Sequence, residues 1–109
     1  MRKLLLIAVL ALLAGTVSAQ RPELLVTMGQ LSVNGGMAEQ AVAVKNNSGI
    51  TLTQVWIECG FLAENGTLLS EGLASINNLR PGAIGYALPK TSHGKGATWA
   101  ICTVSSVRY

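Results

Sequence analysis

Apolar side chains alternate strictly along residues 55–61, and this alternation constrains the fold more than any other feature of the chain. Successive side chains of an extended strand point to opposite faces, so the segment predicts a strand with one apolar face. Asn65-Gly66 follows it, and this dipeptide supplies the positive φ angles of a tight hairpin turn. We therefore predict a hairpin whose return arm begins at Thr67. The apolar face of its first strand holds Val55, Ile57, Cys59 and Phe61.

The same alternation recurs on both sides of this hairpin. Residues 23–33 alternate with a phase slip at Gly29, which is the pattern of a β-bulge. Residues 41–45, 83–88 and 97–108 predict three further strands. Turns rich in Gly, Asn, Ser and Pro separate them, and these residues favour turns over ladders.

One segment departs from the alternation. Leu73, Ile76 and Leu79 recur at every third position, which allows a short helical turn. No other part of the chain after residue 19 carries a helical stripe, and turn signals recur about every 10–16 residues. This pattern predicts an antiparallel all-β sandwich of about six to seven strands, with a small open β-barrel as the alternative.

The first 19 residues have the layout of a secretory signal peptide. The basic start Arg2-Lys3 precedes an apolar run over 4–14, and small residues lead to a cleavage position after Ala19. A membrane anchor would need about 20 apolar residues, and this run is shorter. We therefore predict that the leader is removed, that residues 20–109 form a single domain, and that no stable membrane anchor remains. The mature protein is then secreted or periplasmic.

Removing the leader changes the charge balance. The whole chain carries eight Lys or Arg against five Glu and no Asp, with a formal net charge of +3. Without Arg2 and Lys3, six basic residues stand against five Glu, which leaves a net charge of about +1. Nucleic-acid-binding domains usually cluster basic residues on one face, so this balance argues against a nucleic-acid partner.

Two cysteines in an exported chain predict a disulfide between Cys59 and Cys102. Such a bond would close a loop of 44 residues, counted from one cysteine to the other, and in the chain-entropy model would stabilise the fold by about 4 kcal/mol. A redox or nucleophilic thiol would need a Cys-x-x-Cys spacing or a nearby base, and neither is visible. We therefore interpret the pair as structural.

No constellation typical of an enzyme can be read from the sequence. His93 is the only histidine of the chain, whereas a metal site needs three or four converging ligands. Neither a Ser-His-acid nor a Cys-His arrangement follows from order or spacing. Glu58 lies between apolar neighbours, and we interpret it as an outward-facing strand residue. We predict no catalytic site, no metal and no cofactor.

Six residues are candidates for an interaction surface. By strict alternation the two tryptophans lie opposite the cysteines of their own strands, and they point outward if the cysteines point inward. A change of phase at Gly60 would instead place one tryptophan in the core. The polar loop 89–96 is either solvated or binds an anionic partner. The candidates are Trp56, Trp99, Leu62, Lys90, His93 and Lys95.

Several turn motifs resemble the bacterial FxLYD-type immunoglobulin-like domain. That family places an Asn-Ser turn before a long strand, a Gly hairpin after it, and an L-x-P-G turn before the next strand. The matching residues here are the runs Val44 to Ser48, Leu52 to Phe61, Asn65 to Leu69, and Leu79-Arg80-Pro81-Gly82. The segment 59–63 stands where the family has Phe-x-Leu-Tyr-Asp, and it departs from that motif. The resemblance implies an immunoglobulin-like sandwich and carries over no catalytic residue.

These observations predict an exported, non-enzymatic binding module for a protein or surface ligand. The alternative is a structural subunit of a cell-surface or periplasmic assembly that pairs strand edges. A small hydrolase or redox enzyme is the third reading. The sequence leaves the oligomeric state open, because both the binding module and the assembly subunit fit the same strand pattern.

Overall fold

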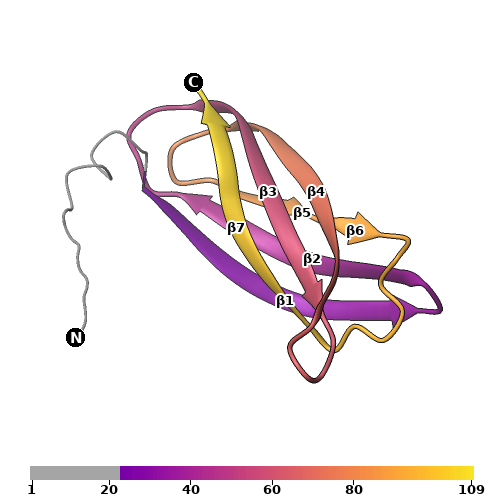
Figure 1. The fold of residues 1–109 in the computed structure, drawn as a ribbon. Helices are drawn as coiled ribbons and strands as arrows, with labels where there is room; N and C mark the ends of the chain where they lie inside the picture. The colour runs from indigo at the N-terminus through magenta and orange to yellow at the C-terminus, as the bar shows by residue number, and fades with distance from the viewer. Residues whose placement is uncertain (1–22) are drawn as a thin grey trace, which may run out of the picture.

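The computed structural model describes residues 23–109, which form two antiparallel β-sheets packed face to face (Figure 1). The predicted signal peptide, residues 1–19, lies outside the described residues. The described part contains no helix, and hence none long and apolar enough to cross a membrane. Its strands are β1 (Leu24–Asn34), β2 (Met37–Asn46), β3 (Leu52–Leu62), β4 (Leu68–Leu79), β5 (Ile84–Ala87), β6 (Lys90–Thr91) and β7 (Trp99–Arg108).

The two sheets have β2 and β3 at their centres. One sheet has the order β1-β2-β5, and the short β6 also pairs with β2; the other has the order β4-β3-β7. Among the described strands, no ladder joins one sheet to the other, so the structure is a sandwich and not a barrel. The predicted antiparallel all-β sandwich is therefore confirmed.

The core lies between the alternating inner faces of the two central strands. Even-numbered residues of β2 point inward, as do Val55, Ile57, Cys59 and Phe61 of β3, and all four of these β3 side chains are fully buried. The alternation predicted for the central strand is thus realised with its apolar face on the core. The buried residues that form the apolar core cluster are Ala38, Val42, Val44, Leu52, Val55, Ile57, Cys59, Phe61, Ile76, Leu79, Ala87 and Ala97.

On one side of the sandwich the sheets approach so closely that only glycine fits. A Cβ atom added to Gly72 of β4 would lie 2.5 Å from the backbone oxygen of Lys90 in β6. A Cβ atom added to Gly85 of β5 would lie 2.5 Å from Cγ2 of Ile76 in β4. A hydrogen bond of 2.6 Å between the hydroxyls of Ser70 and Thr91 joins the sheets at the same side.

Two local predictions are wrong. The predicted helical turn around Leu73, Ile76 and Leu79 is part of the strand β4. Leu73 faces outward and is 55% exposed, whereas Ile76 and Leu79 are both buried, and Asn78 between these two adopts a positive φ of 55°. The predicted hairpin itself is present, since β3 and β4 pair antiparallel across a loop over residues 63–67. The prediction of a positive φ at Asn65 is wrong: Gly66 alone of the two has one, and the Asn65 side chain instead accepts a hydrogen bond from the Thr67 amide.

The predicted bulge in the first strand is present. Met28 pairs with Val42 and Leu31 pairs with Gln40, so two residues of β1 stand opposite one residue of β2. The bulge contains Gly29, whose hypothetical Cβ atom would lie 3.1 Å from the Cβ of Ala41. The slip in sequence phase therefore marks the point where the register changes.

Candidate interaction surface

The outer face of β4-β3-β7 gathers large apolar side chains around a glycine. Strand pairing sets Leu62 beside both Leu68 and Trp99, and sets Gly60 beside Ile101. Trp99 is 45% exposed, and Leu68 and Ile101 are each 53% exposed. Leu62, which the sequence placed on the surface, is buried at 9% exposure and lies beneath them. We call Leu68, Trp99 and Ile101, together with this buried Leu62, the Trp99 patch.

A hollow of about 260 Å³ lies next to this patch, and Gly60 forms part of its lining. The hollow also includes the carboxylates Glu58 and Glu71 and the hydroxyl of Thr103. Glu58 pairs with Thr103 across the ladder, and Glu71 pairs with Gly60 in the row that also holds Ile101, so the two carboxylates come from neighbouring rows of the sheet. The site therefore combines apolar walls with negative charge.

Local hydrogen bonds fix the position of Trp99. Its indole Nε1 donates to the carbonyl oxygen of Ala63 over 3.2 Å. The neighbouring Thr98 amide donates to the carbonyl of Leu62 over 2.8 Å. The ring is therefore held at the end of β3 while nearly half of its surface stays open to solvent. An aromatic ring fixed in this way presents apolar area at little cost in conformational entropy on binding.

Trp56 lies on the same outer face but outside the Trp99 patch. It pairs with Ser75 and Ser106 and is partly buried. Trp56 and Leu62 are six residues apart on β3, or about 20 Å at roughly 3.3 Å per residue. The structure thus places both tryptophans on the face opposite the cysteines, and it does not bring their rings into one patch.

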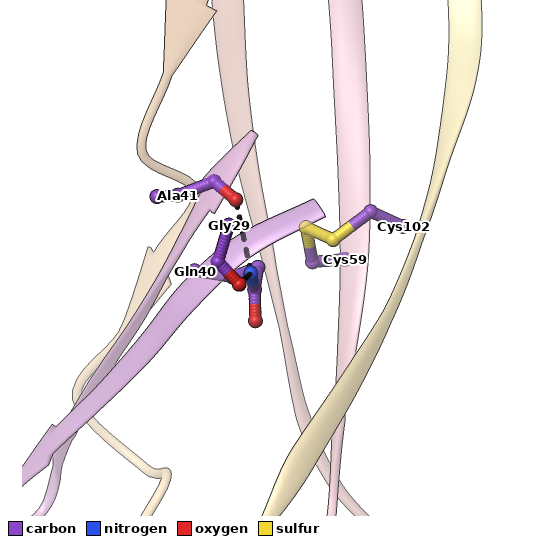
Figure 2. The surroundings of a disulfide bond; sticks show 5 residues. All are labelled: Gly29, Gln40, Ala41, Cys59 and Cys102. Atoms are coloured by element: carbon purple, nitrogen blue, oxygen red, sulfur yellow. Dashed lines mark hydrogen bonds between the residues drawn. A yellow bond between two sulfur atoms is a disulfide. The ribbon is translucent and has the colours of Figure 1, made fainter. Parts of the chain in front are cut away.

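The predicted disulfide between Cys59 and Cys102 is present and joins paired residues of β3 and β7, with Cα atoms 4.0 Å apart. Cys59 is fully buried and Cys102 is partly buried. Figure 2 shows the disulfide together with Gln40 of the other sheet, whose amide nitrogen donates to the carbonyls of Gly29 and Ala41, each over 2.9 Å. The disulfide braces the sheet that carries the Trp99 patch.

The three basic candidates lie on the other sheet or on the loop that leaves it. Lys90 is in β6 and its Nζ lies 3.7 Å from a carboxylate oxygen of Glu39. His93 and Lys95 are exposed in the following loop, where the His93 amide donates to Thr91 Oγ1. The structure therefore does not combine these three residues with the Trp99 patch. Within residues 23–109, no three His, Cys, Asp or Glu side chains gather as a metal site would require.

Sequence reasoning missed four residues of the candidate site. Ile101 shares a strand face with Trp99 two positions away, so alternation alone could have included it. Glu58 lies on the outward face of β3 with Leu62, four positions away, so alternation could have included it as well. Leu68 and Glu71 become neighbours of this face only through strand pairing, which no local pattern reveals.

The sequence matches no model of a known protein family and no curated protein. Among solved structures, the fold is similar to a chain from the structural characterization of IrmA from Escherichia coli. The two chains are 10% identical and align with a TM-score of 0.59, over 79% of this chain and 80% of that chain. At this identity the similarity supports the sandwich fold alone.

Proposed function

We propose that this protein is an exported, non-enzymatic binding module that recognises a protein partner through the outer face of β4-β3-β7. The Trp99 patch is the observation that supports the proposal. It presents a fixed tryptophan beside two half-exposed aliphatic side chains, Leu68 and Ile101, and these two line a hollow. Exposed apolar groups gathered in this way on a small domain are typical of interaction sites.

The charges around the patch define the partner's chemistry. Glu58 and Glu71 stand beside the hollow, and no basic side chain lines it. A partner segment with an apolar side chain for the hollow and a Lys or Arg next to it would complement both features. Such a segment also avoids the cost of burying the two carboxylates without a cationic partner.

Peptide binding tests this proposal. A synthetic peptide with a Leu-Trp-Leu centre flanked by Lys should bind, and the same centre flanked by Glu should bind at least about tenfold more weakly because of like-charge repulsion. Ile101→Lys should abolish binding of the Lys-flanked peptide. The matched control is Ile84→Lys, which makes the same change at a similarly exposed position of the other sheet. Equal binding by both variants, or no preference between the peptides, would contradict the proposal.

The alternative, a subunit that adds strands edge to edge, is supported by the composition of two edge strands. β1 and β7 each pair with a single strand among those described, and each is 10 or 11 residues long. β1 contains no charged residue, and β7 contains only Arg108 near its end. Soluble domains usually protect such edges with charges or proline, so uncharged edges favour pairing with a further strand.

Light scattering across a dilution series distinguishes the two functions. A binding module should keep one mass at all concentrations, whereas an edge-pairing subunit should form larger species as its concentration rises. Polymers that persist in Ile101→Lys would support the edge-pairing function, because the Ile101 side chain points from the sheet face, whereas edge pairing uses the backbone of β7.

A further inference from the structure

The outer face of the opposite sheet has a different character, with small residues in its middle and large apolar residues along one side. Ala41 and Ala43 of the central strand β2 point outward, and Thr27 and Tyr86 flank Ala43 on either side. Gly29 of the bulge lies against Ala41. The result is an apolar floor that runs along β2.

The large residues on the rim face outward for a structural reason. Gly85 and Ala87 of β5 take the inward positions, and Gly85 lies against Ile76 so closely that no side chain fits. The alternating residues Ile84, Tyr86 and Leu88 must then face solvent, where they are 51%, 75% and 50% exposed. Close packing of the two sheets thus creates an exposed apolar rim.

Floor and rim enclose a hollow of about 320 Å³, which we call the trench. This volume lies at the lower end of the range for small-ligand sites. No charged side chain lines the trench, and its side-chain hydroxyls belong to Thr27 and Tyr86. The lining residues are Thr27, Met28, Gly29, Ala41, Val42, Ala43, Tyr86, Ala87 and Leu88.

The two ends of the trench differ in charge. Lys45 follows Ala43 on the same face of β2, between Leu25 and Ile84, and no ion pair neutralises it within residues 23–109. At the other end, the negative charge of Glu39 is paired with Lys90. In the part of the chain that the structure describes, Lys45 is therefore an available cation beyond one end of the trench.

The backbone of the trench excludes strand addition. β2 pairs with β1 on one side and with β5 and β6 on the other, so the trench offers side-chain surface and no free strand edge. A ligand in the trench must therefore be recognised by apolar contact along the trench and by charge at Lys45. The distance from Ala41 to Lys45 is four residues, or about 13 Å at roughly 3.3 Å per residue.

We propose that this trench binds a free aliphatic carboxylate of medium chain length. The hydrocarbon chain lies over Gly29, Ala41 and Ala43 against the rim of Tyr86 and Leu88, and the carboxylate meets the ammonium group of Lys45. This ligand matches the apolar lining, the single cationic end and the length of the channel. The site is on the sheet opposite the Trp99 patch and is independent of the function proposed for that patch.

Calorimetry and NMR on the mature chain with decanoate test the proposal. Decanoate should bind in a one-to-one ratio and shift the amide signals of residues around Ala43 and Tyr86, with little change in β3 and β7. Decanol should bind about two- to fivefold more weakly, the contribution expected of an exposed charge pair. Decyltrimethylammonium should bind more weakly still, because its cation would meet Lys45.

Two kinds of variant locate the ligand. Ala43→Leu fills the floor and should weaken decanoate binding about tenfold or more by steric conflict. Thr103→Leu, which introduces the same leucine side chain at an outward position of the other sheet, is the control. Lys45→Gln should reduce affinity for decanoate to that for decanol, whereas Lys95→Gln should change neither. If circular dichroism shows Ala43→Leu to be unfolded, Tyr86→Ala replaces it in this test. This variant removes a side chain from the rim of the trench that is mostly in solvent.

Several outcomes would overturn the proposal. They are an absence of decanoate binding, signal shifts confined to the β4-β3-β7 sheet, and unchanged affinity in Ala43→Leu with the fold intact. Sedimentation with phosphatidylglycerol vesicles without binding of decanoate would identify a membrane surface as the ligand instead. A dimer that Ala43→Leu dissociates would identify a second copy of the chain as the occupant.

Loss of peptide binding in Ile101→Lys with decanoate binding retained would show that the trench acts independently of the function proposed for the Trp99 patch.

Discussion

Asn46 is the polar residue whose removal should damage the fold most. It is fully buried at the end of β2, and its side chain makes four hydrogen bonds. The amide nitrogen donates to the carbonyls of Ile50 over 2.8 Å and of Leu79 over 2.9 Å. The amide oxygen accepts from the backbone N–H of Ser48 over 2.9 Å and from its hydroxyl over 2.6 Å. Asn46 therefore joins β2 to its own turn and to the end of β4 in the opposite sheet.

The magnitude of the loss follows from these contacts. In Asn46→Ala, the Leu79 carbonyl loses its donor in a buried position, which costs about 1–3 kcal/mol. The bonds that close the turn to Ser48 and Ile50 add about 1 kcal/mol, since they are partly open to water. We expect a total near 3 kcal/mol, a large share of the roughly 5–15 kcal/mol that stabilises a typical domain. Asn46→Asp keeps the acceptor but has no donor for the two carbonyls, so it should cost at least as much.

Urea unfolding followed by tryptophan fluorescence measures this effect. The control is Asn47→Ala, because the neighbouring Asn47 is exposed and should change the free energy of unfolding by less than about 0.5 kcal/mol. A loss below about 0.5 kcal/mol in Asn46→Ala would refute the reasoning. So would equal losses in the two variants, because the effect would then belong to the turn sequence and not to the buried amide.

Three further predictions concern other parts of the chain. Thiol titration of denatured, unreduced protein should find no free thiol at Cys59 or Cys102, and two reactive thiols would contradict the disulfide. Reduction should lower the free energy of unfolding by about 4 kcal/mol. In the same urea assay, Gly72→Ala should lower the free energy of unfolding by about 1–3 kcal/mol, because the added Cβ would meet the Lys90 backbone. The control Gly49→Ala adds its Cβ in open space and should be nearly neutral. Intact-mass measurement of exported protein should find a chain that starts at Gln20, and a retained leader would contradict the predicted cleavage.

The central strand shows how much of the fold the sequence could predict. Its alternation required one buried and one exposed face, and the structure places Val55 and Phe61 inside and Trp99, on the paired strand, outside. The bulge at Gly29 was also visible, because a bulge shifts the phase of alternation by one residue. Local periodicity carries this information since side chains of a strand alternate wherever the strand lies.

The candidate site was only partly predictable. Trp99 and Leu62 were identified, but Glu58 was interpreted as a plain surface residue, and Lys90 was grouped with them although it lies in the other sheet. Which side chains share a face across strands depends on register and strand order. Neither is encoded locally in a chain whose strands pair across long separations, as β3 does with β7.

What the sequence determined by itself is the pattern of strands, turns and cysteines, because propensity and alternation act over a few residues. Only the tertiary structure decided how the faces are used. In β5, alternation placed Tyr86 on one face of the strand and Gly85 on the other. Hydrophobicity alone would have buried the face with the larger side chains, that of Tyr86. The structure buries the smaller face, because β4 lies too close to Gly85 to leave room for any side chain. The trench on the outer face of β2 exists for the same reason, since the distance between the two sheets determines which residues remain exposed.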